Sequence, residues 1–539
     1  MKIRLPMMIQ DPKLSGYQHL KRIVERPYFH EASFSDGPAC PRLAVFDLNP
    51  LTGMTWPAVP FTAPSGDRKL WRYPISNEKD IYSSDFMAVS AFGTVLRTLH
   101  MFEEADTLGR PLTWAFAEPQ LLIWPRAGEM AQAFYVRALH SLKFHYISNP
   151  KEPTQRVYTC LSRDIVCHET GHAVLDGIAP RLWDAITPQS RAIHETVADL
   201  TAVVMSFRSG HLREAILNET GGSIDNVRAF SSIGEEFGQV HLKLDCLRDL
   251  RNTLRMDQVD PGEAYALSEV LSAALYKMII GIYQRKWQEL SGEGAALNFS
   301  LSGKALAIAV EHFKRMIFRS LDYLPPAEVS FIDYARAIIA ADQASHPKDE
   351  QERGFIREEF SERGIVQDAH DLDVETDFER PELAQLDLAA LVSDDGVAQD
   401  FAKRNRELLS IPEGVPFNVE PRLDVTKLYY HKGGQKQRVR ECLFKVWWRQ
   451  LEQNPLGNSL PEDREISVGT TLAIDWETKR VRALLTSDRR ARPEEAEAQR
   501  SARDAMLRCL VETGELREET QVDVSGNILR AKSIGNKLR

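Results

Sequence analysis

Long hydrophobic runs are missing from this sequence. No segment has the roughly 18–20 consecutive apolar residues that span a bilayer, and Lys277 interrupts the apolar stretch 271–283, which we interpret as a buried helix. The N-terminal segment contains no apolar core of the kind that a signal peptide needs. Cysteine is also scarce, with 6 in 539 residues and no Cys-x-x-Cys pair. These absences predict a cytoplasmic protein with free thiols, without a membrane partner or a disulfide scaffold.

An excess of positive charge is missing as well. The chain has 77 Asp and Glu residues against 67 Lys and Arg residues, for a net charge of -10. This balance disfavours general binding to nucleic acid, which attracts basic surfaces. The composition is otherwise that of a globular protein, 43% hydrophobic and 27% charged, and it excludes a disordered or fibrous chain.

Composition divides the chain into four regions and predicts an α+β fold. Residues 1–160 carry short β-like runs broken by Pro and Gly, and residues 161–366 show mostly helical spacing of apolar side chains. Residues 367–420 are rich in acidic residues, which is typical of a solvated connector or a surface-lying segment. Residues 421–539 indicate a small, separate α/β domain. We therefore expect a β-rich N-terminal lobe with an edge strand, a helical lobe, an acidic connector and an accessory domain.

Periodicity also predicts individual elements. In the first region we expect strands at 42–48, 112–117 and 133–147 and a helix at 86–105. In the last region we expect an amphipathic helix at 439–452, a β-hairpin at 470–487 and a charged helix at 492–514.

The segment His168-Glu169-Thr-Gly-His172 carries the clearest chemical signal. Residues four apart share one face of a helix, so both imidazoles can reach one metal ion. Glu169 lies beside them, where it can take a proton from metal-bound water. The alternative is a helix with two partly exposed histidines and no metal.

A third ligand is needed for a catalytic zinc site, which leaves one position for water. Glu195 follows His172 by 23 residues, and Asp199 lies one turn further along the same helical face. Because the first helix ends near Gly177, a loop permits an antiparallel return that brings Glu195 to the metal. Asp199 can then accept a hydrogen bond from a ligand imidazole. The alternative is a solvated acidic face.

The pattern of His168, Glu169 and His172 followed by Glu195 and Asp199 resembles the thermolysin-like gluzincin metallopeptidases, whose pattern is HExxH followed by ExxxD. The resemblance covers roughly residues 80–367 and is strongest at 160–207. It implies a thermolysin-like zincin fold, with two His and one Glu as ligands of a single Zn²⁺. It also implies that Glu169 is the general base and that Asp199 is the partner of His168.

Further substrate-binding residues are implied by the same resemblance. Gln132 and Ala133 stand at the start of a segment similar to the family's edge strand, which binds the substrate backbone. Arg228 stands where the family has an arginine for a substrate carbonyl, although an ordinary surface arginine is an equal alternative.

The sequence also departs from the family at several positions. Trp183 stands where a tyrosine stabilises the oxyanion, and Tyr265 stands in place of a catalytic histidine, with His241 as a competing candidate. We assign Tyr265 the catalytic role, with a core aromatic as the alternative. Asp164 matches one calcium-binding acid of the family, but Ser206 stands at the position of another. We therefore do not expect a calcium site. No recognisable signal or propeptide is expected. Cys167 is interpreted as a core thiol, because adjacent residues on a helix point about 100° apart.

These residues together predict a cytoplasmic zinc metallopeptidase, an endopeptidase that hydrolyses peptides or proteins through a Glu-activated, zinc-bound water. One alternative is a catalytically degenerate zincin that binds metal or peptide. Another is an interaction protein that acts through its accessory domain, where a basic and aromatic cluster could bind nucleic acid but is more typical of a solvated helix start. The cluster comprises Lys427, Tyr429, Tyr430, Lys432, Lys436, Arg438 and Arg440. The acidic segment 367–420 could also lie over the cleft as an inhibitory strap.

Overall fold

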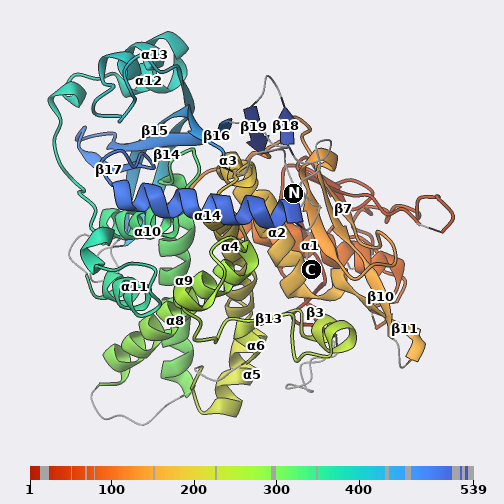
Figure 1. The fold of residues 1–539 in the computed structure, drawn as a ribbon. Coiled ribbons are helices and arrows are strands. Elements are labelled where there is room, and N and C mark those ends of the chain that lie inside the picture. Colours follow the sequence, from red (N-terminus) through yellow and green to blue (C-terminus); the bar gives the residue numbers. More distant parts are fainter. Residues whose placement is uncertain are drawn as a thin grey trace.

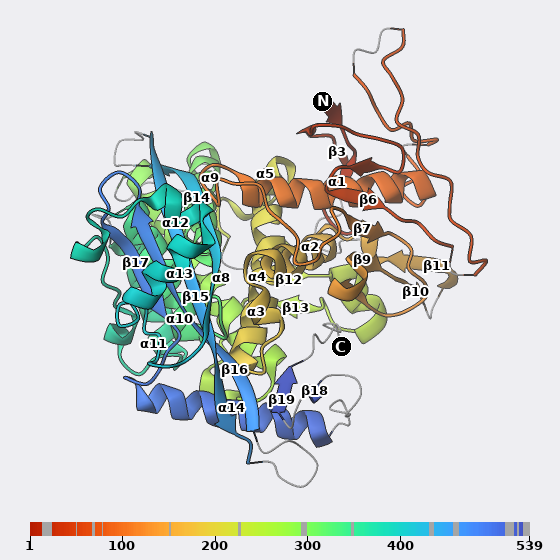
Figure 2. The ribbon, with the colours of Figure 1, turned by 90° about the horizontal axis from the view of Figure 1, so that it is seen from above.

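The computed structural model describes residues 1–12, 24–49, 51–66, 70–77, 79–149, 152–224, 228–292, 299–346, 350–430, 436–455, 463–512, 522–524 and 528–531. It combines helices and strands, which agrees with the predicted α+β class. A β-rich N-terminal lobe lies on one side, helices lie in the middle and a second sheet lies on the other side (Figures 1 and 2). The helices α2 (Arg163–Ile178) and α4 (Pro188–Phe207) lie between the two sheets.

The N-terminal lobe packs helix α1 (Ser84–Glu103) against a five-stranded sheet of order β5-β6-β7-β9-β8. The central strands are parallel, and β8 pairs antiparallel with β9 at the edge. An edge strand is confirmed at Ala133, but the single strand predicted over 133–147 is wrong, because the chain turns at 137–139 and forms β8, β9 and β10 instead. The strands of this lobe are β1 (Lys2–Arg4), β2 (Met7–Met8), β3 (Val24–Glu25), β4 (Tyr28–His30), β5 (Ala39–Cys40), β6 (Leu43–Val45), β7 (Leu121–Trp124), β8 (Ala133–Val136), β9 (Ser141–Phe144), β10 (Tyr146–Asn149) and β11 (Glu152–Tyr158).

The predicted strand at 112–117 is wrong, because these residues run as an irregular segment. Its backbone packs against the end of α2: a Cβ placed on Gly177 would lie 2.1 Å from the carbonyl oxygen of Thr113. This tight contact takes the place of a strand ladder. It also explains why the last turn of α2 contains glycine.

The helical lobe surrounds α4 with long apolar helices, and its largest buried cluster includes side chains of α2, α4, α8, α9 and α10. The remaining helices of this lobe are α3 (Pro180–Trp183), α5 (Gly210–Thr220), α6 (Arg228–Ser231), α7 (Glu235–Phe237), α8 (Ala264–Ser291), α9 (Phe299–Arg319), α10 (Phe331–Ser345) and α11 (Gln351–Glu362); the short strands β12 (Ser232–Ile233) and β13 (Arg248–Asp249) pair beside them. Helix α8 is long and apolar enough to cross a membrane, but 72% of its most apolar window is buried inside the protein. This agrees with the predicted buried helix at 271–283.

The C-terminal region forms a sheet in which β14 (Phe417–Tyr430), β15 (Lys436–Gln453), β16 (Asp463–Asp475) and β17 (Val481–Thr486) are antiparallel neighbours. The hairpin of β16 and β17 and the charged helix α14 (Pro493–Glu512) are confirmed. The short strands β18 (Val522–Val524) and β19 (Ile528–Ala531) continue the sheet beyond β16. The region that we expected to be a separate domain shares its core with the helical lobe, because Leu443 and Ala473 belong to the helical cluster.

The predicted helix at 439–452 is wrong, because this segment lies in the long strand β15. Residues 441–448 are all buried, since the sheet is covered on both faces. Leu443 packs into the helical lobe, whereas Phe444 and Val446 pack against α12 (Leu388–Ser393) and α13 (Asp395–Arg404). A strand buried on both faces has a continuous apolar run, which periodicity does not separate from a buried helix.

The acidic segment 367–420 covers one face of this sheet. Its apolar side chains are buried there, including those of Leu388, Leu391 and Phe401. The expected basic and aromatic cluster is divided: Tyr429 is buried, and the fully buried Lys427 Nζ lies 2.9 Å from Asp322 Oδ2. Lys436, Arg438 and Arg440 are exposed on strand β15. Lys432 lies outside the described residues. The alternative of nucleic-acid binding therefore loses two of its central residues.

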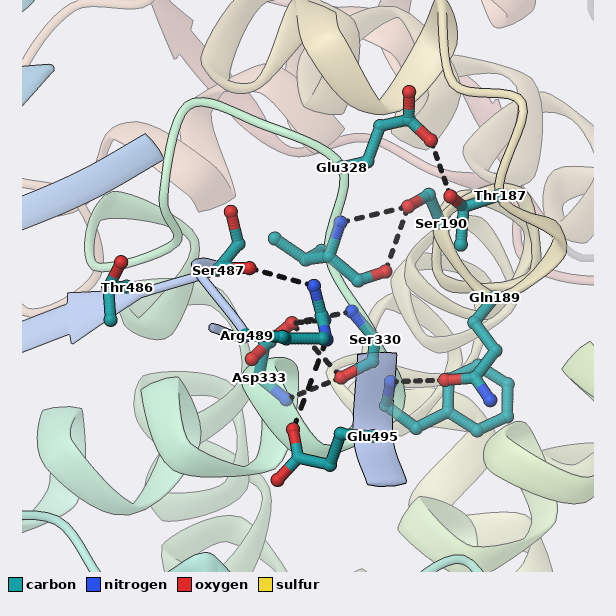
Figure 3. Close-up of polar contacts among 12 residues, drawn as sticks. Thr187, Gln189, Ser190, Glu328, Ser330, Asp333, Thr486, Ser487, Arg489 and Glu495 are labelled. Atoms are coloured by element: carbon teal, nitrogen blue, oxygen red, sulfur yellow. Dashed lines mark hydrogen bonds and ion pairs between the residues drawn. The ribbon is translucent and has the colours of Figure 1, made fainter. Parts of the chain in front are cut away.

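The loop before α10 holds the start of helix α4 (Figure 3), and Arg503 of α14 adds a contact from the C-terminal region. The Thr187 hydroxyl donates to Glu328, and Arg503 Nη1 donates to Thr187 Oγ1 at 3.2 Å. Ser190 Oγ donates to the Val329 carbonyl oxygen at 2.8 Å, just before helix α10 begins. Side chains of α14 and of the loop before α10 thus fix the helix that carries Glu195.

Candidate metal centre

The site forms where α2 and α4 cross at very short distance. Ser162 caps the start of α2, and its hydroxyl accepts from the Ile165 amide. A Cβ placed on Gly171 would lie 2.9 Å from Ala198 Cα and 2.9 Å from Thr201 Oγ1. Only glycine therefore permits this approach of the helices, which brings one face of α2 against one face of α4.

The three predicted ligands converge at this crossing. His168 Nε2 and His172 Nε2 lie 3.0 Å apart. Glu195 Oε2 lies 3.6 Å from His168 Nε2 and 3.8 Å from His172 Nε2. Two imidazole nitrogens and one carboxylate oxygen thus face a common point, and their chemistry fits a divalent metal ion.

Asp199 lies behind His168, as the sequence predicts. Its Oδ1 is 3.1 Å from His168 Nδ1, while its Oδ2 accepts from Ser272 Oγ at 2.9 Å and lies 2.9 Å from Arg248 Nη2. An acidic partner on Nδ1 keeps the proton there and leaves the Nε2 lone pair for a metal. Arg248 in turn compensates the buried charge of Asp199.

His172 has a second histidine behind it. Its Nδ1 lies 2.8 Å from Nδ1 of His194, and the two rings are stacked with centroids 5.0 Å apart. Trp183 meets the His194 ring edge to face at 4.9 Å. Trp183 also lies 6.3 Å from the His172 ring, so it packs beside both histidines of the candidate centre.

Glu169 lies beside the ligands and is held by the edge strand. Its Oε2 accepts from the backbone amide of Tyr135 in β8 at 2.8 Å. Burial raises the pKa of Glu169 to about 7, because the charged form is poorly solvated and Glu195 is close. A carboxyl group with this pKa can both accept and release a proton near neutral pH.

The ligand side chains have strongly shifted pKa values without a metal. Burial alone lowers the pKa of His168, but Asp199 and Glu195 raise it to about 10. Burial lowers the pKa of His172 to about 4. Burial favours the neutral form of Glu195, but the two ligand histidines and Arg248 lower its pKa to about 2. The centre therefore offers a carboxylate and a neutral His172 imidazole.

The other predicted residues lie on or next to the edge strand β8 and on helices α6 and α8. Burial raises the pKa of Tyr265 well above its usual value, and the carboxylates of Glu195 and Glu169 raise it further, which places this phenol in the electrostatic environment of the centre. Ala133 is in the edge strand, and the carbonyl oxygen of Gln132 lies 3.1 Å from His145 Nδ1. Arg228 begins α6, but its side chain lies outside the described residues.

Further predictions concern the surroundings of the site. Cys167 is buried and accepts from Thr98 Oγ1 at 3.4 Å, as expected of a core thiol. All six cysteines are free. Ser206 Oγ donates to Asp164 Oδ1 at 3.1 Å, and burial together with Asp11 raises the pKa of Asp164 well above its usual value. His241 is exposed, whereas the ligands are buried.

Sequence reasoning missed several residues that complete the centre. His194 could have been found, because it directly precedes Glu195 and two adjacent polar residues in an apolar helix need partners. Arg248, Ser272 and the Tyr135 amide come from distant segments and carry no local signal. Comparisons of the chain with protein-family models and with curated proteins find no match, so the family resemblance stays a prediction.

Proposed function

We propose that this protein is a zinc-dependent metallopeptidase whose α+β fold has the thermolysin-like arrangement. The observation that carries the proposal is the convergence of His168, His172 and Glu195 on one point, with Glu169 beside them. Two imidazoles and a carboxylate are a ligand set of catalytic zinc sites. When bound, Zn²⁺ supplies a Lewis acid that polarises a carbonyl group and acidifies water.

The residues around the centre have complementary roles in peptide hydrolysis. Glu169 takes a proton from the attacking water and delivers it to the leaving amine. The Tyr135 amide keeps the Glu169 carboxylate in place, and the Tyr265 phenol donates to the developing oxyanion. The edge strand β8, with Gln132 and Ala133 at its start, offers backbone groups to an extended peptide.

A second candidate is a protein that binds zinc or peptide without hydrolysis. The burial of the centre favours it, because Glu169 is 1% exposed and the three ligands are at most 3% exposed. A peptidase must open this region to admit a substrate. The two candidates agree on the metal and differ only in turnover.

Chelation and metal restoration separate the two candidates. The purified full-length chain is incubated with an unstructured protein such as casein, before and after removal of metal and after return of Zn²⁺. We expect cleavage that is lost on chelation and restored by zinc. Zinc binding without cleavage would support the second candidate.

The role of Tyr265 is tested separately. If its phenol stabilises the oxyanion, Tyr265→Phe should lower kcat more than it changes KM.

A further inference from the structure

A second cluster of metal-ligand side chains lies in the helical lobe, apart from the centre between α2 and α4. His312 Nε2 and His346 Nδ1 each lie 3.1 Å from the same oxygen, Oδ1 of Asp342. The three ligand atoms all lie within 4.8 Å of one another. The two imidazole rings are tilted by 34° to each other, with centroids 4.6 Å apart.

The helices bring these side chains together from two segments. Asp342 lies in the last turn of α10, and His346 is the residue that follows the end of this helix at Ser345. His312 comes from α9, which packs beside α10. The cluster therefore joins two neighbouring helices.

The distances fit a metal ion. With metal–ligand bonds of about 2.0–2.1 Å, tetrahedral ligand atoms lie roughly 3.3–3.4 Å apart. The two 3.1 Å separations in the second cluster are close to this value. The centre between α2 and α4 has separations of 3.0, 3.6 and 3.8 Å.

The residues behind the second cluster orient its ligands. His312 Nδ1 faces Glu352 Oε1 at 3.7 Å, and the fully buried Glu352 is held by Lys286 Nζ at 2.9 Å. A carboxylate behind an imidazole fixes the ring for metal binding. Asp342 Oδ2 accepts from Arg353 Nη1 at 2.7 Å, which leaves Oδ1 to the cluster. The series of imidazole, carboxylate and cation formed by His312, Glu352 and Lys286 is the same as that of His168, Asp199 and Arg248 in the first centre.

An ion can reach this cluster from solvent. The side chain of His346 is 14% exposed, whereas that of Asp342 is 1% exposed. We propose that His312, Asp342 and His346 bind a second divalent metal ion, Zn²⁺ in preference to Mg²⁺ or Ca²⁺, as a structural clamp between α9 and α10. Two imidazoles and one carboxylate favour Zn²⁺ over the oxygen-seeking cations.

Metal stoichiometry of the full-length chain tests this site. Zinc is counted by mass spectrometry and by competition with a chromophoric chelator, for the wild type, His346→Gln and a His168→Gln, His172→Gln double variant. His370→Gln is the matched control, because His370 also lies 2.9 Å from an aspartate but is 85% exposed. We expect two zinc ions in the wild type and the control, and one in each of the other two proteins.

The outcomes distinguish this site from the proposed peptidase centre. A His346→Gln protein with the same zinc content as the wild type would overturn the second site, as would a zinc-free double variant. A thermal-shift series checks folding: in the double-variant background Zn²⁺ should raise Tm with increasing concentration. Adding His346→Gln should abolish that rise, and an unchanged rise would contradict the proposal.

Discussion

Replacement of Asp199 by asparagine should weaken metal binding without changing any metal ligand. Asp199 lies 3.1 Å from His168 Nδ1 and 2.9 Å from Arg248 Nη2, and it is fully buried. Asparagine keeps the shape but removes the charge that stabilises the Nδ1 proton of His168. Loss of such a partner typically lowers metal affinity about 10–100-fold, which corresponds to about 1.4–2.7 kcal/mol.

Zinc affinity of Asp199→Asn is measured by chelator competition, with circular dichroism to confirm folding because Arg248 loses its counter-charge. Ser272→Ala is the matched control: it removes one neutral donor to Asp199 Oδ2 but leaves the charge and Arg248 in place. We expect a much smaller change for the control. An Asp199→Asn protein that is folded and binds zinc as tightly as the wild type would refute the assigned role.

Three further changes have clear expected outcomes. Gly171→Ala should destabilise the protein by about 1–3 kcal/mol and weaken zinc binding, because the added Cβ would force α2 and α4 apart. Gly210→Ala is the control, since a Cβ at Gly210 would have nothing within 4 Å. In denaturation and chelator assays the control should change neither stability nor zinc affinity. Lys427→Met should lower the free energy of unfolding by about 1.5–3 kcal/mol in urea denaturation, because it removes one of the two cations, Lys427 and Arg110, that pair with the buried Asp322 carboxylate; a loss below about 1 kcal/mol would contradict this role. Burial lowers the pKa of Lys445 to about 7. Between about pH 7 and 10 this amine is therefore neutral in the folded state and protonated in the unfolded state. The free energy of unfolding should rise with pH in this range, by up to about 1.4 kcal/mol per pH unit. The same slope in Lys445→Met would contradict this assignment.

The sequence alone predicts that His168, His172 and Glu195 come together, because local geometry sets their positions. His168 and His172 share a helix face through their spacing, and Glu195 and Asp199 do so on the next long helix. The close crossing at Gly171 then leaves little freedom in how these faces meet. The relative positions of side chains within one helix turn can therefore be predicted from the sequence.

Other parts depended on contacts between distant segments. Periodicity predicts a helix at 439–452, but this segment lies in strand β15, where burial on both faces removes the alternation that marks a strand. Arg248 reaches Asp199 from a short strand, and His312 reaches Asp342 from a neighbouring helix. No local sequence pattern predicts such contacts between distant segments, because they depend on how the elements pack.

The most direct test of the proposed peptidase compares the wild type with Glu169→Gln at equal zinc content. Glutamine preserves the shape of the side chain and can still accept from the Tyr135 amide, but it cannot take a proton. We expect equal zinc binding at His168, His172 and Glu195 and cleavage of casein by the wild type only, with a loss of at least about 100-fold in the variant. Equal cleavage by both proteins, or no cleavage by a zinc-loaded wild type, would contradict the proposed function.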